Sequence, residues 1–306
     1  MTRPLKVGVQ LPEVERVVRW PEQLAMARAT EAVGFDTVWV GDHLLYRWPG
    51  IAEARGPWEC WTMLAAIAAV TSRITLGPLV ASTSFHAPAM LAKQAATVDE
   101  ISGGRLILGL GAGWNETEYR AFGFPFDHRI SRFEEAFTII RTLLREGSID
   151  FDGSYYQARD CELQPRSTRP GGPPILLGSR GPRMLAIGIP NIDAWNAWYN
   201  DTGNRATGVP PLIATVDAAA RAAGRDPAEI ERTVAVLVQM PGGTGRFAGN
   251  YTASGIPALA GSPEVMADEL RAYARAGIGA VQLVLDPISE ASIEAFGPVL
   301  ELLDAD

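Results

Sequence analysis

The sequence is poor in lysine, histidine and cysteine. Only Lys6 and Lys93 among its 27 basic residues are lysines, and it has three histidines and two cysteines. Because arginine stays charged at any relevant pH, there is little scope for Schiff-base or lysine general-base catalysis. Cys60 and Cys161 are far apart and lack CxxC spacing, so neither a disulfide framework nor a zinc knuckle is indicated. We expect a reduced, intracellular protein.

Long apolar runs and a basic surface are also missing. The longest apolar run, residues 63–70, is far too short to cross a bilayer, and the first residues lack the apolar core of a signal peptide. The formal net charge is −8, which argues against a general nucleic-acid binder, since such a protein neutralises phosphates with a basic face. We therefore expect a cytoplasmic protein that binds neither nucleic acid nor membrane.

The sequence does contain a regular alternation of predicted strands and helices. It has 306 residues, of which 47% are hydrophobic, as is typical of a globular enzyme. Apolar, β-branched runs predict strands, and alanine-rich or amphipathic stretches between them predict helices. The predicted strands are residues 5–11, 37–40, 74–80, 106–110, 174–177, 192–195, 233–239 and 280–285, and the first helices are residues 21–33, 58–71 and 88–101.

Strand–helix units repeated in this way predict a parallel (β/α)8 TIM barrel, because each crossover must return the chain to the same end of the sheet. A doubly wound sheet is the alternative. It calls for a glycine-rich turn after the first strand, where this sequence reads QLPEVERV. We predict one domain over residues 1–306, with insertions at about 147–172, which contains the hairpin pattern FDGSYY, and at about 241–261.

Polar residues just after barrel strands are the first candidates for chemistry. Asp42 and His43 follow the second predicted strand, and an imidazole beside a carboxylate can act as acid, base or hydrogen-bond donor. The alternative is that Asp42 only caps the next segment and that His43 only packs against its neighbours. His86 and His128 are predicted to be loop or cap residues. No HExxH, HxH or GxSxG motif occurs, so neither a metal site nor a serine hydrolase is indicated.

Two glycine-rich loops indicate a cofactor. Residues 109–119, GLGAGWNETEY, follow the fourth predicted strand, and their backbone can approach a flat ligand closely, with Trp114 as a wall. The alternative is that these glycines only relieve crowding in a tight turn. The second loop, GSRGP at residues 178–182, precedes a predicted helix and carries Arg180 and Arg183 nearby, which suits phosphate. Together they predict a phosphorylated aromatic cofactor and redox chemistry.

The chain resembles the bacterial luciferase-like monooxygenase superfamily at five places. These are GDHLL at residues 41–45, ITLGPLV at 74–80, the block 86–119, PPILLGSRGPRML at 173–185, and DELRAYARAGIGAVQLVLDP at 268–287. The resemblance implies a (β/α)8 barrel that binds the deazaflavin F420 or FMN at its mouth. It also implies hydride transfer between that cofactor and a substrate.

The resemblance also implies roles for particular residues. His43 would contact the reacting centre and give a hydrogen bond or proton to the substrate oxygen, with Asp42 holding its orientation. A bulge with a cis peptide at Leu79 and Val80 would back the ring, with Ser82 near the ring edge. The ring-edge loop would be Gly111, Ala112, Gly113, Trp114 and Asn115, and the phosphate loop would be Gly178, Ser179, Arg180 and Gly181.

Substrate and partners follow from the same resemblance. Trp114 stands where the sugar-phosphate dehydrogenases of the family carry a glutamate proton donor, and few lysines are present to clamp a phosphorylated substrate. We therefore expect a small neutral or apolar organic substrate, with Trp48, Trp58 and Trp114 among the pocket aromatics. The alternatives are an FMN-dependent monooxygenase served by a partner flavin reductase, and a non-catalytic flavin-binding protein. A homodimer is expected, with residues 63–70 as a possible isologous contact.

Overall fold

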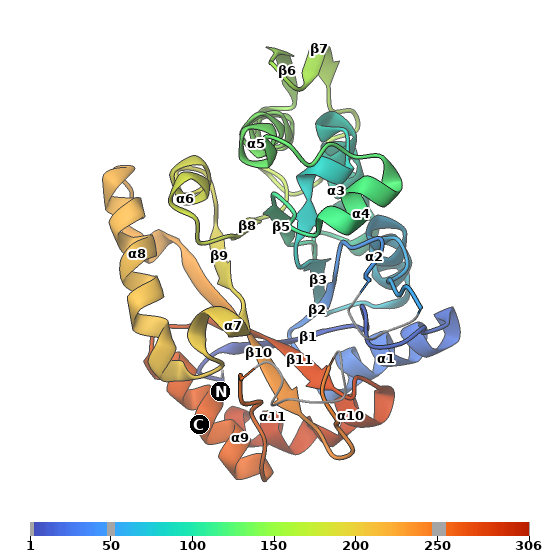
Figure 1. Ribbon diagram of the computed structural model, residues 1–306, viewed down its shortest axis with the longest axis vertical. Helices are drawn as coiled ribbons and strands as arrows, with labels where there is room; N and C mark the ends of the chain where they lie inside the picture. Colours follow the sequence, from blue (N-terminus) through green and yellow to red (C-terminus); the bar gives the residue numbers. More distant parts are fainter. Residues whose placement is uncertain (1–2, 48–52, 247–254, 306) are drawn as a thin grey trace.

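The protein forms a barrel of parallel strands surrounded by helices (Figure 1). The computed structural model describes residues 3–47, 53–246 and 255–305. The strands are β1 (Lys6–Gln10), β2 (Thr37–Val40), β3 (Thr75–Pro78), β4 (Ala81–Ser82), β5 (Leu108–Gly111), β6 (Ser148–Asp152), β7 (Gln157–Glu162), β8 (Ile175–Gly178), β9 (Ala194–Ala197), β10 (Glu231–Gln239) and β11 (Ala280–Asp286). Short 3₁₀ helices are η1 (Thr83–Phe85), η2 (Ala206–Gly208) and η3 (Pro227–Glu229).

The helices follow the strands as the sequence predicts. They are α1 (Trp20–Val33), α2 (Cys60–Val70), α3 (Pro88–Ser102), α4 (Glu116–Phe122), α5 (Arg129–Glu146), α6 (Pro182–Gly188), α7 (Tyr199–Thr202), α8 (Val209–Ala222), α9 (Pro263–Arg275), α10 (Glu290–Ala295) and α11 (Gly297–Asp304). The first helix shows why the ends of these helices can be predicted from the sequence. It has Pro21 in its first turn and ends at Gly34, whose φ of 96° is left-handed, as a helix cap requires.

The barrel is closed at eight strand positions. The hydrogen-bonded order is β3-β2-β1-β11-β10-β9-β8-β5-β4, and a parallel bridge between Leu76 and Leu106 joins β3 to the segment before β5. Because β3 pairs with β2 and β4 pairs with β5, β3 and β4 share one position. The predicted barrel is confirmed, and the one predicted strand at residues 74–80 is divided by a cis peptide bond between Leu79 and Val80.

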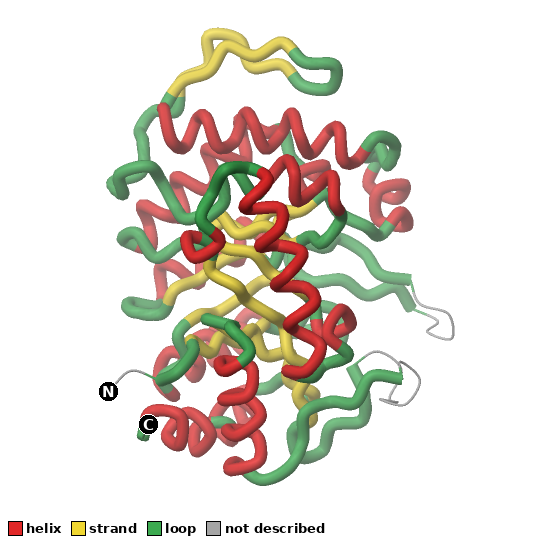
Figure 2. Tube along the Cα trace, turned by 90° about the vertical axis from the view of Figure 1, so that its left-hand side faces the viewer, coloured by secondary structure: helices red, strands yellow, loops and turns green. Residues whose placement is uncertain are grey.

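The segment predicted as the first insertion carries an antiparallel hairpin of β6 and β7. The last four residues of the FDGSYY sequence, 153–156, form its turn, and the hairpin projects from the barrel at the end of α5 (Figures 1 and 2). The second predicted insertion is described only up to Arg246 and from Gly255 onward. No helix of the described ranges is both long and apolar enough to cross a membrane.

The main hydrophobic core lies between the strands and the helices that surround them. It includes residues of α2, and Leu64 and Ile67 on that helix are fully buried within the chain itself. Residues 63–70 were expected as a subunit contact. The largest side chains of this run are instead buried in the core of their own chain. Exposed positions of the run, such as Ala69, are small.

The barrel closes at a seam where two backbones touch. Along β3 and β5, Gly77 lies against the carbonyl oxygen of Ile107, and Gly109 lies against that of Pro78. A Cβ on either glycine would overlap the facing carbonyl oxygen. These two glycines are therefore required by the close approach of two strands, whatever ligand the barrel binds.

We expect Gly109→Ala to lower the free energy of unfolding by about 1–3 kcal/mol, because the new methyl group meets rigid backbone at the seam. Chemical denaturation with an unchanged m value measures this loss. The matched control is Gly297→Ala at the start of α11, where a Cβ meets only Val33 at 3.6 Å. The control should be neutral or slightly stabilising. Equal stability of the two variants would contradict this account of the seam.

Candidate active site

His43 lies between two buried carboxylates at the C-terminal end of the barrel. It follows β2, and its Nδ1 is 2.8 Å from Oε1 of Glu118 on α4. Its Nε2 is 3.3 Å from Oε1 of Glu13, which follows β1. The other Glu118 oxygen accepts hydrogen bonds from the backbone amides of Leu44 and Leu45, at 2.8 and 3.3 Å. Glu118 thus holds both the imidazole and the segment that carries it.

The two carboxylates favour the charged form of His43. Burial alone would lower the pKa of His43, but Glu13, Glu118 and the nearby Asp42 outweigh burial and hold the pKa above its ordinary value of 6.5. A buried charge is stable only when it is paired. The charged form of His43 is therefore favoured, with Nδ1 firmly held and Nε2 held by the longer contact.

Glu13 is itself part of a buried charge network. Its carboxylate accepts hydrogen bonds from the Tyr46 hydroxyl at 2.7 Å, from Gln10 Nε2 at 3.0 Å and from Arg246 Nη2 at 2.7 Å. Arg246 also binds Glu15 at 2.6 Å through Nε. Burial raises the pKa of the Glu13 carboxyl, yet His43 and Arg246 with these hydrogen bonds bring it below its ordinary value. Glu13 therefore stays anionic beside His43.

The expected role of Asp42 is wrong. Its Oδ2 accepts a hydrogen bond from the Ser82 amide at 2.8 Å and lies 2.9 Å from Nε2 of His86, while both ring nitrogens of His43 face glutamates. Successive side chains of an extended segment point to opposite sides, so neighbours in sequence have different partners here. His86, expected to be a loop or cap residue, is the imidazole that Asp42 holds. His128 is solvated, as predicted, with 62% of its side chain exposed.

The bulge and both glycine loops meet at one side chain. The cis peptide bond between Leu79 and Val80 lies where the resemblance implies it. A Cβ built on Gly111 or on Gly178 would come within 2.8 and 2.9 Å of the Val80 methyl groups. Both glycines therefore make room for Val80. The half-buried Val80 side chain thereby lies between the loop after β5 and the loop after β8.

The remaining predicted cofactor residues differ in exposure. Trp114 is 56% exposed, and its ring centre is 5.7 Å from that of His43. Asn115 Nδ2 donates a hydrogen bond to the Leu45 carbonyl at 2.9 Å, which ties the loop after β5 to the segment of His43. Leu79, Ser82 and Gly111 are buried, whereas Val80, Ala112, Gly113, Asn115, Gly178, Ser179 and Gly181 are half-buried, and Arg180 is exposed.

The loop after β8 is held by its own chain. The Ser179 carbonyl accepts a hydrogen bond from the Trp195 indole at 2.7 Å, and the Gly181 amide donates to the Ser179 hydroxyl at 3.4 Å. Arg180 pairs with Asp201 at 2.9 Å. Arg183 pairs with Glu134 at 3.0 Å, so its charge is already engaged on α5. Of the other aromatic residues predicted for the pocket, Trp58 donates to the Val18 carbonyl at 2.6 Å, and Trp48 lies outside the described residues.

Sequence reasoning missed Glu13, Glu118 and Arg246. All three lie outside the predicted strands, and the barrel brings Glu13 and Arg246 together from positions 233 residues apart. The GLGAGWNETEY stretch did contain Glu118. Glu118 directly precedes a tyrosine in the helix that follows this loop. A carboxylate at that place, near the C-terminal end of a barrel strand, was the signal that could have identified it.

The chain is similar to known oxidoreductases. The 5,10-methylenetetrahydromethanopterin reductase of Archaeoglobus fulgidus is 32% identical over 52% of this chain and 44% of that protein. The pyrimidine monooxygenase RutA of Cronobacter sakazakii is 34% identical over 55% of this chain and 50% of that protein. The matched part of the chain thus spans about half the length of these curated relatives.

Solved structures share the fold. An F420-dependent secondary alcohol dehydrogenase in complex with an F420-acetone adduct superposes with a TM-score of 0.80 at 20% identity, covering 98% of this chain and 99% of that one. At this identity the likeness concerns the fold alone. The model of the luciferase-like monooxygenase family matches residues 6–241, which is most of the chain. The chain therefore belongs to the luciferase-like monooxygenase family.

Proposed function

We propose that this protein is an F420-dependent oxidoreductase that transfers a hydride between the deazaflavin and a small neutral or apolar organic substrate. The observation that carries the proposal is His43, an imidazolium held between Glu13 and Glu118 beside the exposed ring of Trp114. A proton donor at the mouth of a barrel is what reduction of a carbonyl needs next to a hydride source. An F420-dependent glucose-6-phosphate dehydrogenase of Amycolatopsis mediterranei, 35% identical over 50% of this chain and 45% of that protein, supports the choice of cofactor.

The residues at the mouth fit a flat ring. Val80 presents part of its side chain between the two glycine-rich loops, and Trp114 presents an uncovered aromatic surface. At the end of β1, Oε1 of Gln10 is buried and has no hydrogen-bond partner in the described residues. A ring with apolar faces and a hydrogen-bond donor on its edge satisfies both kinds of surface. The backbone amides of residues 178–181 would donate hydrogen bonds to the phosphate of the cofactor.

His43 would act as the acid at Nε2. The bound deazaflavin supplies or accepts the hydride. Glu118 fixes the ring through Nδ1, so the proton that can move is the one on Nε2, whose contact with Glu13 is long at 3.3 Å. Passing it to a substrate oxygen leaves a neutral imidazole between two carboxylates, which favours its return. In the oxidative direction the same nitrogen accepts the proton from an alcohol.

The charges around the mouth favour a neutral substrate. Glu13, Glu15 and Glu118 bring three carboxylates to this region, against His43 and Arg246 as the opposing charges in the same network. An anionic substrate would meet a local excess of negative charge without a free partner in this network. Trp114 adds apolar surface beside the proton donor.

The second candidate is an FMN-dependent monooxygenase on the same scaffold. The pyrimidine monooxygenase relative favours it. It would need reduced flavin from a partner reductase. A flavin-binding protein without catalysis is the third candidate, and the buried charge around His43 argues against it, because such an arrangement is costly to keep without a use. In each case we propose a homodimer, whose assembly sedimentation would measure.

We expect the purified protein to bind F420 at least about tenfold more tightly than FMN, since a site that serves F420 selects the deazaflavin over the flavin. Titration of each cofactor, followed by its fluorescence, measures the two dissociation constants. The opposite preference would favour the monooxygenase candidate. Binding of neither cofactor would refute both enzymatic candidates.

We expect His43→Ala to slow the oxidation of reduced F420 by small ketones, acetone among them, by about 10²–10⁴-fold, because the proton donor is lost. The dissociation constant for F420 should change by less than about threefold. His128→Ala is the matched control, because it removes an exposed histidine. An unchanged rate in His43→Ala would remove His43 from the mechanism.

The charge of His43 should depend on Glu13. Since the pKa of His43 is raised, the imidazolium persists above pH 6.5 and is lost only as the pH rises through the higher folded value. Glu13→Gln removes one of the three stabilising charges, so we expect the pKa of His43 to fall. With only three histidines in the chain, a ring-nitrogen NMR titration resolves each one, and His128 serves as the internal control. An identical titration of His43 in both proteins would exclude this coupling.

A further inference from the structure

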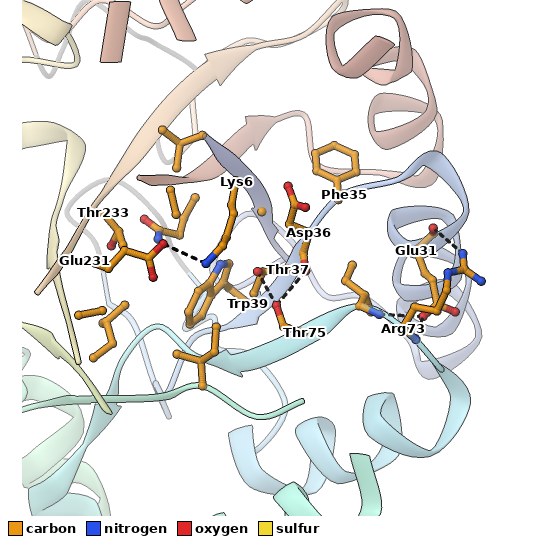
Figure 3. A pocket seen from close by; sticks show the side chains of 18 of the residues that line it. Lys6, Glu31, Phe35, Asp36, Thr37, Trp39, Arg73, Thr75, Glu231 and Thr233 are labelled. Atoms are coloured by element: carbon orange, nitrogen blue, oxygen red, sulfur yellow. Dashed lines mark hydrogen bonds and ion pairs between the residues drawn. The ribbon is translucent and has the colours of Figure 1, made fainter. Parts of the chain in front are cut away.

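A cavity of about 390 Å³ opens at the N-terminal end of the barrel strands, opposite to His43. Its rim is formed by the first residues of several strands, among them Lys6 of β1 and Glu231 of β10, and Trp39 lies deeper inside (Figure 3). TIM barrels ordinarily fill this region with bulky branched side chains. A hollow of this size is within the range of small-molecule sites.

The cavity exists because small residues point into it. Gly8, Ala194 and Ala280 line it where other barrels carry Val, Ile or Leu. Gly8 cannot be larger, because a Cβ there would lie 2.7 Å from Nε1 of Trp39. The indole therefore forms one wall of the hollow, with Leu176 as another.

An apolar layer separates the cavity from the mouth. Trp39, Leu176 and Ala194 pack in one cluster with Leu79, and the half-buried Val80 packs against that cluster. Val80 belongs to the bulge that the proposed cofactor site uses, whereas Trp39 faces the cavity. The cavity is thus a site of its own and not an extension of the mouth.

Two hydrogen-bond donors in the cavity wall have no acceptor in the described residues, and one of them, Gln282 Nε2, is buried. Gln282 is 1% exposed, and its Oε1 accepts a hydrogen bond from Asn196 at 2.7 Å, but its Nε2 has no partner in the described residues. Trp39 is 3% exposed, and its indole N–H donates to no residue of the described ranges. Buried donors are nearly always satisfied, and leaving one unsatisfied costs free energy. Both residues line the same hollow.

We propose that this cavity is a second small-molecule site, which takes a neutral organic ligand whose carbonyl oxygen accepts hydrogen bonds from Gln282 Nε2 and Trp39 Nε1. The ligand is neutral because the charges at the rim are engaged. Lys6 binds Glu231 at 3.0 Å, and Asp36 binds Arg3 at 3.2 Å. The apolar walls at Leu176 and Ile107 cover the rest of such a ligand. This inference is independent of the function proposed for the mouth.

Acetophenone is a suitable probe, with ethylbenzene as the analogue of similar shape without the oxygen. The chain has eight tryptophans, so a ¹H–¹⁵N correlation spectrum shows at most eight indole N–H signals. The signal that disappears in Trp39→Phe is the one from Trp39. We expect acetophenone at millimolar concentration to shift the Trp39 signal in a saturable manner. Ethylbenzene should bind about tenfold more weakly, since it offers no acceptor.

Two variants test the donors. Gln282→Leu should weaken acetophenone binding at the Trp39 signal by about fivefold to tenfold. Thr233→Val is the matched control at another residue that lines the cavity. It breaks the 2.9 Å hydrogen bond from Asn196 in the same network, but valine keeps the shape of threonine and both cavity donors stay in place, so binding should stay within about threefold. Thermal unfolding confirms that each variant is folded.

Three outcomes would overturn the proposal. A Trp39 signal that does not move at any soluble concentration of acetophenone means that the cavity holds only water. Shifts confined to residues around His43 mean that the ketone binds at the mouth alone. Equal binding of acetophenone and ethylbenzene, or equal effects of Gln282→Leu and Thr233→Val, means that the two donors do not recognise the oxygen.

Discussion

The arrangement at the mouth depends on one half-buried imidazole between two buried carboxylates. Glu13 and Glu118 face the two ring nitrogens of His43, and their charges favour its protonated form. Each carboxylate has further partners. Glu118 binds the backbone of residues 44–45, and Glu13 binds Tyr46 and Arg246. The ends of β1 and β2, helix α4 and the segment after β10 are thus joined by a single electrostatic network, and the orientation of His43 is a property of the whole mouth.

A second constraint is steric and lies beside the first. The Val80 side chain at the Leu79–Val80 bulge takes up space beside the neighbouring strands. These strands leave room for it because Gly109, Gly111 and Gly178 have no side chain. The same glycines that resemble a ligand-binding loop in the sequence are therefore needed for the barrel to close around Val80. Packing and ligand approach are not competing explanations here, since the space released by the glycines is what places Val80 at the surface of the mouth.

The sequence was sufficient for the barrel and for His43, and insufficient for the partners of His43. Strand positions follow from apolar β-branched runs and from proline and glycine at helix ends, which are local signals, so 37–40 and 280–285 were predicted nearly to the residue. The partners of a side chain, by contrast, depend on residues that are distant in the sequence. Asp42 and His43 are neighbours in sequence, yet the first holds His86 and the second lies between glutamates. Arg246 reaches Glu13 across 233 positions, and no pattern within a short window encodes that contact.

The two ends of the barrel differ in the kind of ligand that they can hold. At the mouth, paired charges surround a proton donor, so a ligand there can exchange a proton with the protein. At the opposite end, the inner wall offers Gln282 and Trp39, which donate hydrogen bonds and do not titrate in the physiological range. The layer of Trp39, Leu79, Leu176 and Ala194 lies between them. Because this layer is apolar and Val80 packs against it, a ligand on one side can affect the other only by moving these side chains.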